Sequence, residues 1–366
     1  MPGPKTSLDV RADPTRGRRQ LGAVSSLAML ALSSLALSSL ATSGARADES
    51  ATSFWLPGTF GSLAAAPAQP GFSFASVYYH TSVSAGADVV RSREIQVGRL
   101  NPTINTNLNA SLQATGDVAL LIPSYVFGTP VLGGQFAVQV AAIVGRSSAA
   151  AAGTLTAGVP PFSLIRSIDV VDSSSGFGDL YPQASLKWNY GTSNIMTYVS
   201  GDIPVGNYNA GSIANMGLGH AAIDGGGGYT YFDPTKGHEF SAVAGFTYNF
   251  MNQTTNYQSG VDFHLDWAVS QFLSKQFFLG AVGYVYNQIS DDSGSGARLG
   301  GFRSRVLAVG PQVGYIFPLE GRQAFLGLKA YYEFDAQNRP QGFNTWLTLS
   351  VSDAAATARP APLIRK

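Results

Sequence analysis

The sequence predicts an all-β fold, a transmembrane antiparallel up-and-down β-barrel of about twelve strands. Three observations lead to this prediction: polar and apolar residues alternate over long segments, the connections between those segments alternate in length, and the N-terminus reads as an export signal. The composition agrees, because 42 of the 366 residues are Gly, aromatic residues are frequent and only 12% are charged. Such a composition is unusual for a cytosolic globular protein.

The composition also excludes several kinds of site and partner. The chain has no Cys, so it can form neither a disulfide framework nor a thiolate metal site. Its formal net charge is +1, whereas binding to nucleic-acid phosphates requires clustered Lys and Arg. A nucleic-acid partner is therefore not expected.

Residues 1–47 are expected to be a cleaved signal peptide. Arg16, Arg18 and Arg19 form a basic start, residues 21–41 form an apolar stretch broken by Ser, and residues 45–47 read Ala-Arg-Ala, a typical cleavage site. A membrane anchor is the alternative, which the serines and the cleavage site make less favoured. Without residues 1–47 the chain keeps 17 basic and 20 acidic residues, a net charge of −3.

Period-two alternation marks the strands. In residues 177–190, FGDLYPQASLKWNY, the even positions from Leu180 to Tyr190 are mostly apolar and the odd positions are mostly polar. A phase slip near Gly116 suggests a bulge. Twelve segments are expected to be strands: 72–81, 104–127, 135–146, 176–190, 194–206, 221–232, 238–250, 257–272, 276–288, 303–317, 323–335 and 342–352.

The connections distinguish a membrane barrel from a soluble β-sandwich. Short links at 129–134, 191–193, 233–237, 274–276 and 318–322 alternate with links that are mostly longer, at 82–103, 147–175, 207–220, 251–256, 289–302 and 336–341. Tight turns at one end and longer loops at the other are typical of outer-membrane barrels. Many segments run longer than the roughly 5–6 residues common in soluble sheets, and aromatic residues such as Trp188 and Tyr315 fit interfacial girdles. An even strand count places both termini in the periplasm.

Several stretches resemble a bacterial outer-membrane family named for the meta-pathway of phenol degradation. The similarity covers about residues 54–352, nearly all of the chain after the signal. It implies a barrel transporter or porin for hydrophobic and aromatic compounds. The stretches are FWLPGTFGSLAAAPAQPGFSF (54–74), GFGDLYPQASLKWN (176–189), YVSGDIPVGNY (198–208), GHAAIDGGGGYTYFDPTKGHEFSAVAGFTYNF (219–250) and GVDFHLDWAVSQFLSKQF (260–277).

Polar residues opposite the apolar rows are expected to line the lumen. Turning them toward lipid would cost about 2–4 kcal/mol for a Lys at mid-membrane and less for an acid. They form either a polar pore wall or a structural network of ion pairs and hydrogen bonds, and the sequence favours neither. These residues are Asp179, Tyr181, Gln183, Lys187, Tyr198, Asp202, Asp224, Glu239, Asp262, His264, Asp266, Lys329 and Glu333.

The triplet Asp262, His264 and Asp266 is the strongest candidate for chemistry. Alternate residues of one strand share a face, so these three could bind a metal, but no second His is placed nearby and a metal site is not expected. The acids would favour a protonated imidazole, which suggests pH sensing or pairing near Lys329 or Glu333. No Gly-x-Ser-x-Gly elbow occurs, so the protein is not expected to be an enzyme, and no cofactor is expected.

Residues Gly225, Gly226, Gly227 and Gly228 remove side chains from both faces of a predicted strand. One interpretation is a bend or close packing against an inner segment. The sharper hypothesis is a lateral gap through which an apolar solute leaves the barrel. Pro123, Pro182, Pro204 and Pro311 add further weak points, because each deletes a hydrogen-bond donor.

The two ends of the mature chain lie outside the periodic pattern. Residues 48–71 are largely apolar and punctuated by Gly and Pro, so they are expected to fold into the lumen as a plug rather than expose an apolar patch. The barrel is expected over 72–352. Residues 353–366 are rich in Ala and Pro and are expected to be a disordered periplasmic tail.

The resulting expectation is a passive channel in the bacterial outer membrane for small hydrophobic compounds, aromatic ones in particular. A structural or adhesive barrel with a blocked lumen is the alternative, and an outer-membrane hydrolase is a distant third. Its partners would be outer-membrane lipid, the solutes and the barrel-assembly machinery, and a monomer is favoured.

Overall fold

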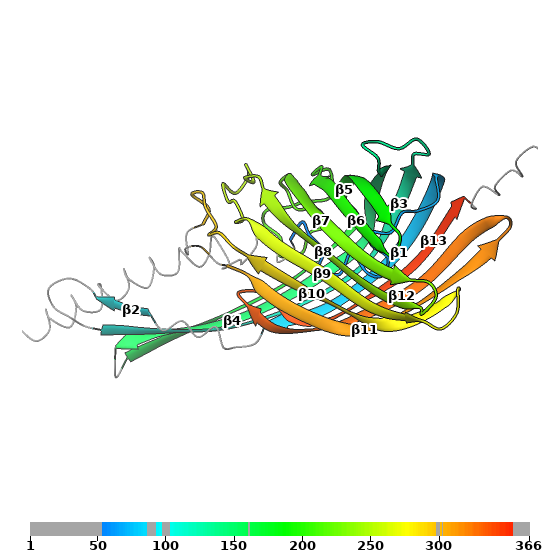
Figure 1. The fold of residues 1–366 in the computed structure, drawn as a ribbon. Helices are drawn as coiled ribbons and strands as arrows, with labels where there is room; N and C mark the ends of the chain where they lie inside the picture. The colour runs from blue at the N-terminus through cyan, green and yellow to red at the C-terminus, as the bar shows by residue number, and fades with distance from the viewer. Residues whose placement is uncertain are drawn as a thin grey trace, which may run out of the picture. The chain divides into compact units, whose positions relative to one another are not determined.

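Twelve long antiparallel strands close into a barrel in the computed structural model (Figure 1). The structure describes residues 53–85, 93–96, 103–159, 162–297, 301 and 303–353, and all of them belong to the unit Ala47–Lys366. The strands are β1 (Gly71–Ala85), β2 (Arg93–Gln96), β3 (Thr103–Val126), β4 (Gln135–Val159), β5 (Phe162–Tyr190), β6 (Ser193–Asp202), β7 (Ala222–Asp233), β8 (His238–Asn249), β9 (Asp262–Phe272), β10 (Phe277–Gln288), β11 (Arg305–Leu319), β12 (Arg322–Gln337) and β13 (Gln341–Asp353).

The ring closes through β1. This strand pairs with β13 on one side, from Ser73↔Ser352 onward, and with β3 on the other, from Gly71↔Val126 onward. The four-residue β2 pairs with β3 alone, beyond the last residue of β3 that pairs with β1. The closed wall therefore consists of β1 and β3–β13, which confirms the predicted twelve-stranded barrel.

Each strand separates an apolar outer face from an inner face that is rich in polar groups. On β13, Leu347 and Leu349 point outward and are 44% and 47% exposed. Trp346, which directly precedes Leu347, points inward and is 3% exposed. Polar side chains of the inner face, including Glu239 and His264, are buried. Period two thus produces a lipid-facing surface and a filled interior.

The strands differ from the prediction in several places. β1 continues to Ala85, and β6 ends at Asp202, so Pro204 lies in a loop and not in the strand predicted to contain it. Residues 147–175, expected to be a loop, continue β4 and β5 as a paired hairpin. β9 begins at Asp262 rather than 257, and Asp353, expected in the tail, ends β13. The bulge expected near Gly116 is absent, because β3 stays in register with both neighbours there.

A bulge does occur in β5. Ala142 of β4 faces Leu180, but Val144 faces Phe177, so β5 contains one extra residue between them. The extra residue reverses the phase of β5. Phe177, expected on the same face as Asp179, instead points outward and is 71% exposed, whereas Asp179 is fully buried.

The connections define two ends of the barrel. The turn end carries the links 127–134, 191–192, 234–237, 273–276 and 320–321, and the loop end carries the longer links 203–221, 250–261 and 289–304. Residues 338–340 make one short link at the loop end. No helix among the described residues has the length and hydropathy of a membrane span. The expected signal peptide and residues 354–366 lie outside the described residues.

Candidate functional site

Residues 53–70, the inner segment, lie inside the barrel. They contain no strand, and their hydrogen bonds to the wall join residues 67 to 273 positions apart in sequence. Phe54, Trp55 and Ala65 are buried. The segment is the part of the expected plug that the structure describes, because residues 48–52 lie outside the described ranges.

Two wall carboxylates bind the backbone of the inner segment. Asp266 of β9 accepts hydrogen bonds from the Gly58 N–H at 2.9 Å and the Phe60 N–H at 3.0 Å. Glu239 of β8 accepts one from the Leu63 N–H at 3.0 Å. A segment without regular structure must find partners for its buried N–H groups. The inner-face acids supply those partners.

Two lysines bind the carbonyl oxygens of the same segment. Lys329 of β12 donates to the Gly58 carbonyl oxygen at 2.5 Å, and Lys187 of β5 donates to the Ala66 carbonyl oxygen at 3.2 Å. Gln135 at the start of β4 makes a reciprocal pair of hydrogen bonds with Ala68. Four of the residues predicted to line the lumen thus bind the inner segment through hydrogen bonds: Lys187, Glu239, Asp266 and Lys329.

The predicted triplet divides into three separate environments. Asp262 accepts a hydrogen bond from the Asn249 side-chain amide at 2.9 Å, and Asp266 binds the inner segment. His264 lies 2.8 Å from Asp224 through its Nε2, and in the described part of the chain no hydrogen bond or ion pair joins it to Lys329 or Glu333. The indole of Trp55 stacks on the imidazole with the ring centroids 3.7 Å apart. Within the described ranges, no group of three or more His, Asp or Glu could hold a metal ion.

The glycine run makes room for this stack. Gly226 pairs with Tyr198 on one side and with Gly245 on the other, and Gly245 pairs with His264. A Cβ on Gly245 would lie 2.3 Å from the Tyr198 hydroxyl. Both glycines therefore let the Tyr198 and His264 side chains lie against the wall. This arrangement agrees with the first interpretation of the glycine run, close packing against an inner segment.

The wall is continuous at Gly225, Gly226, Gly227 and Gly228. Each of the four pairs with a residue of β6 and a residue of β8. A lateral exit here would require paired strands to separate, so the hypothesis of a gap finds no support in the pairing and stays a prediction.

The remaining predicted lumen residues lie nearer the loop end. Asp179 accepts hydrogen bonds from the Gly206 and Leu218 N–H groups, both at 2.7 Å, and so holds loop 203–221 against the wall. Glu333 accepts the Tyr284 hydroxyl at 2.6 Å and the Gly342 N–H at 2.9 Å. Tyr181 packs against Phe54 with ring centroids 5.5 Å apart. Asp202 is 5% exposed, and its carboxylate oxygens make no hydrogen bond within the described part of the chain.

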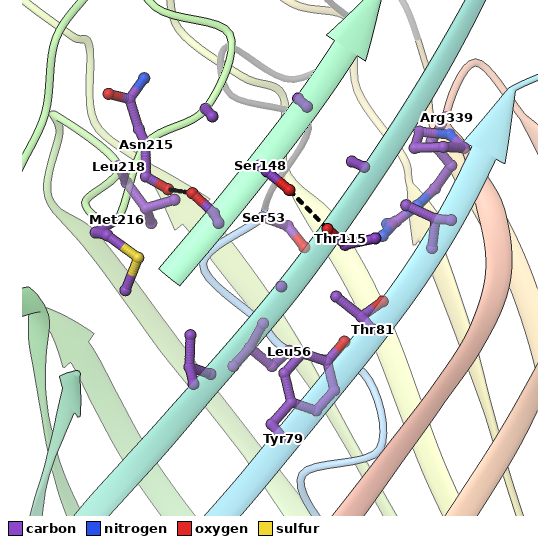
Figure 2. Close-up of a pocket in the computed structure, with 18 of the residues that line it drawn as sticks. Ser53, Leu56, Tyr79, Thr81, Thr115, Ser148, Asn215, Met216, Leu218 and Arg339 are labelled. Atoms are coloured by element: carbon purple, nitrogen blue, oxygen red, sulfur yellow. Dashed lines mark hydrogen bonds between the residues drawn. The ribbon is translucent and has the colours of Figure 1, made fainter. Parts of the chain in front are cut away.

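A cavity of about 170 Å³ lies above the inner segment, toward the loop end. Figure 2 shows Leu56 of the segment beside Tyr79 of β1, with Asn215, Met216 and Leu218 of loop 203–221 on another side. The lining is mostly apolar or small, and Glu333 and Arg339 are its charged members. An apolar cavity of about 150 Å³ in another protein holds benzene. This cavity has the size for one aromatic ring.

The sequence did not predict the cavity. Only Tyr181 and Glu333 of the predicted lumen residues line it. The other walls come from β1, β3 and β4 and from loop 203–221. Their inner-face residues, such as Ala114 and Val118, are small or apolar, so they carry no polar signal against the apolar outer row. A search for polar residues opposite an apolar row therefore overlooks them.

The fold, the apolar outer face and the filled lumen together define the protein as a bacterial outer-membrane barrel. Residues 74–349 match the family model described as "Putative MetA-pathway of phenol degradation", and the chain belongs to this family. The resemblance seen in the sequence is thereby confirmed.

A solved channel structure shares the fold. An outer membrane channel from Pseudomonas putida F1 superposes with a TM-score of 0.57 at 15% identity, over 78% of this chain and 97% of that chain. A FadL homologue from Pseudomonas aeruginosa has a TM-score of 0.35 at 10% identity, over 77% and 90% of the two chains. The sequence has no match among curated proteins.

Proposed function

We propose that the protein is a passive channel for small hydrophobic compounds, aromatic ones in particular. The cavity above the inner segment carries this proposal, because its volume and apolar lining suit a single aromatic ring. The family description, which refers to phenol degradation, supports the same class of solute. Solutes would enter from the loop end and descend their concentration gradient past the inner segment.

A barrel with a blocked lumen is the second candidate, and one observation favours it. The inner segment is fixed to the wall by two carboxylates and two lysines, so it could act as a permanent stopper. The two candidates differ in whether filling the cavity changes transport.

The variant Ala114→Trp tests the proposal. Ala114 lines the cavity from the inner face of β3, and an indole there would occupy the space of the solute. Uptake of labelled phenol at low concentration by intact cells should fall to that of cells without the protein. Leu121→Trp, on the outer face of the same strand, is the matched control and should transport normally. If Ala114→Trp is inserted normally and transports like the native protein, the channel proposal is wrong.

A further inference from the structure

The hydrogen bonds of the inner segment leave one sector of the wall free. Its side-chain hydrogen bonds reach β4, β5, β7, β8, β9, β11 and β12. Within the described ranges, no hydrogen bond joins it to β1, β3 or β13. These three strands are neighbours around the closing strand β1, so they form one uninterrupted sector of wall.

The register fixes which inner-face residues of this sector share a level. Val77 lies between Leu120 and Thr348, one level below Tyr79 and Val118 of the cavity. Ala75 lies between Ile122 and Ser350 at the next level. Ser73 lies between Ser124 and Ser352 nearest the turn end. The side chains thus become smaller and more polar toward the turn end.

Burial changes along the same direction. Val77 and Leu120 are each 7% exposed, and they belong to one packed cluster with Leu56 of the inner segment. In contrast Ala75, Ser73 and Ser350 are only partly buried, although they point inward. A tight apolar level therefore separates the cavity from a more open level, where Ala75 and Ser350 lie beside Ile122.

We infer that solutes leave the cavity along β13, β1 and β3 and not through the wall at the glycine run. Val77, Leu120 and Leu56 form an apolar constriction at the floor of the cavity. The vestibule below it, defined by Ser73, Ala75, Ser124, Ser350 and Ser352, opens to the periplasm at the turn end. This inference rests on the proposed function and adds the route and its selectivity.

The constriction also defines the class of solute. A hydrophobic constriction excludes water and ions, and no charged side chain occupies the levels of Val77 or Ala75 on these three strands. An uncharged ring passes at little cost, whereas an aromatic carboxylate would have to lose its hydration. The expected solutes are therefore uncharged monocyclic aromatics.

Single cysteines test the route, since the native chain has none. Ser350→Cys places a thiol in the vestibule, and its neighbour Leu349→Cys places one on the outer face, 47% exposed toward lipid. Purified variants would be treated with a sulfonatoethyl methanethiosulfonate, checked by mass spectrometry and reconstituted for phenol uptake. Ser350→Cys should be modified and should lose uptake to the level of protein-free vesicles, whereas Leu349→Cys should keep full uptake.

The outcomes separate this route from the channel function itself. Complete modification of Ser350→Cys with unchanged uptake, in a protein that Ala114→Trp inactivates, would overturn the route alone. Failure of the reagent to modify Ser350→Cys would also overturn it, because the vestibule would then be closed to solvent. If neither modification nor Ala114→Trp alters uptake, the channel function fails as well.

The constriction has its own test in ion conductance. Leu120→Ser places a hydroxyl at the apolar level and should raise single-channel conductance severalfold. Leu121→Ser changes the adjacent lipid-facing residue and should leave conductance unaltered. Equal conductance in both variants would show that Leu120 does not form the barrier.

Discussion

The charged residues of the inner wall act through individual neighbours, not as one polar surface. Asp262, His264 and Asp266 share a face of β9, yet they contact Asn249, Asp224 and the inner segment respectively. A hydrogen bond to a charged group contributes about 1.5–3 kcal/mol, and an aromatic pair contributes about 0.5–1.5 kcal/mol beyond its buried area. Asp266, with two such hydrogen bonds, should therefore hold the inner segment more firmly than the Trp55–His264 stack.

Alanine at these two positions should reveal the difference. Asp266→Ala leaves the Gly58 and Phe60 N–H groups without their carboxylate and should loosen the inner segment, so single-channel conductance should rise and become noisy. His264→Ala should change conductance less and should not prevent folding. The measurement is planar-bilayer recording, with heat-modified gel mobility as the control for a folded barrel. If His264→Ala fails to assemble, the stack and the Asp224 contact are required for the fold.

For single residues, the sequence predicts whether a side chain points into the barrel, but not which group it binds there. Period two and an apolar opposite row are sufficient to place Asp224 or Lys329 inward. Their partners could not be predicted, because Lys329 binds a segment without periodicity and Asp224 binds a residue 40 positions away. Phe177 is an exception in direction, because a bulge within an apparently regular alternation turns it outward.

Among the elements, the inner segment has the clearest consequence for transport. It enters the lumen as the chain immediately before β1 and fills space that a barrel of this size would otherwise leave to water. The wall residues that bind it are charged or polar, so water can replace the segment as their partner.

Deletion of residues 48–70 should therefore give a folded barrel of higher conductance. Gly71 is retained because it begins β1. Conductance in planar bilayers should exceed that of the native protein and of Asp266→Ala. Unchanged conductance would mean that the segment does not obstruct the ion path, and it would contradict the plug.

The strands were predictable where lipid imposes an apolar row and less so beyond it. The twelve predicted segments correspond to the twelve wall strands. The largest error lies in residues 147–175, where β4 and β5 continue as a hairpin of Ser and Ala with weak alternation. Where no lipid requires an apolar row, alternation loses its physical cause, and a paired strand cannot be distinguished from a loop.

On the scale of the whole molecule, a passive channel matters only when the outside concentration is low. Flux through it follows the gradient, and no described feature supplies energy. A strain without the protein should thus grow poorly on a dilute uncharged aromatic such as toluene and normally on benzoate or an aliphatic acid. Growth curves at limiting and saturating concentration test this, with native protein and Ala114→Trp as complementing controls. Equal growth on dilute toluene with and without the protein would count against aromatic uptake.

The seam between β1 and β13 links assembly to the contents of the lumen. Ser73 meets Ser352 across about 280 residues of chain, a loop whose closure costs an entropy equivalent to about 5 kcal/mol. We therefore expect the first strand of the barrel to pair with the last late in assembly. Because residues 53–70 are joined directly to that first strand, pairing of the seam also delivers them to the interior. On this expectation, the rate of the final strand pairing sets when the lumen becomes occupied, and a factor that holds the edge of β13 during assembly would control both events.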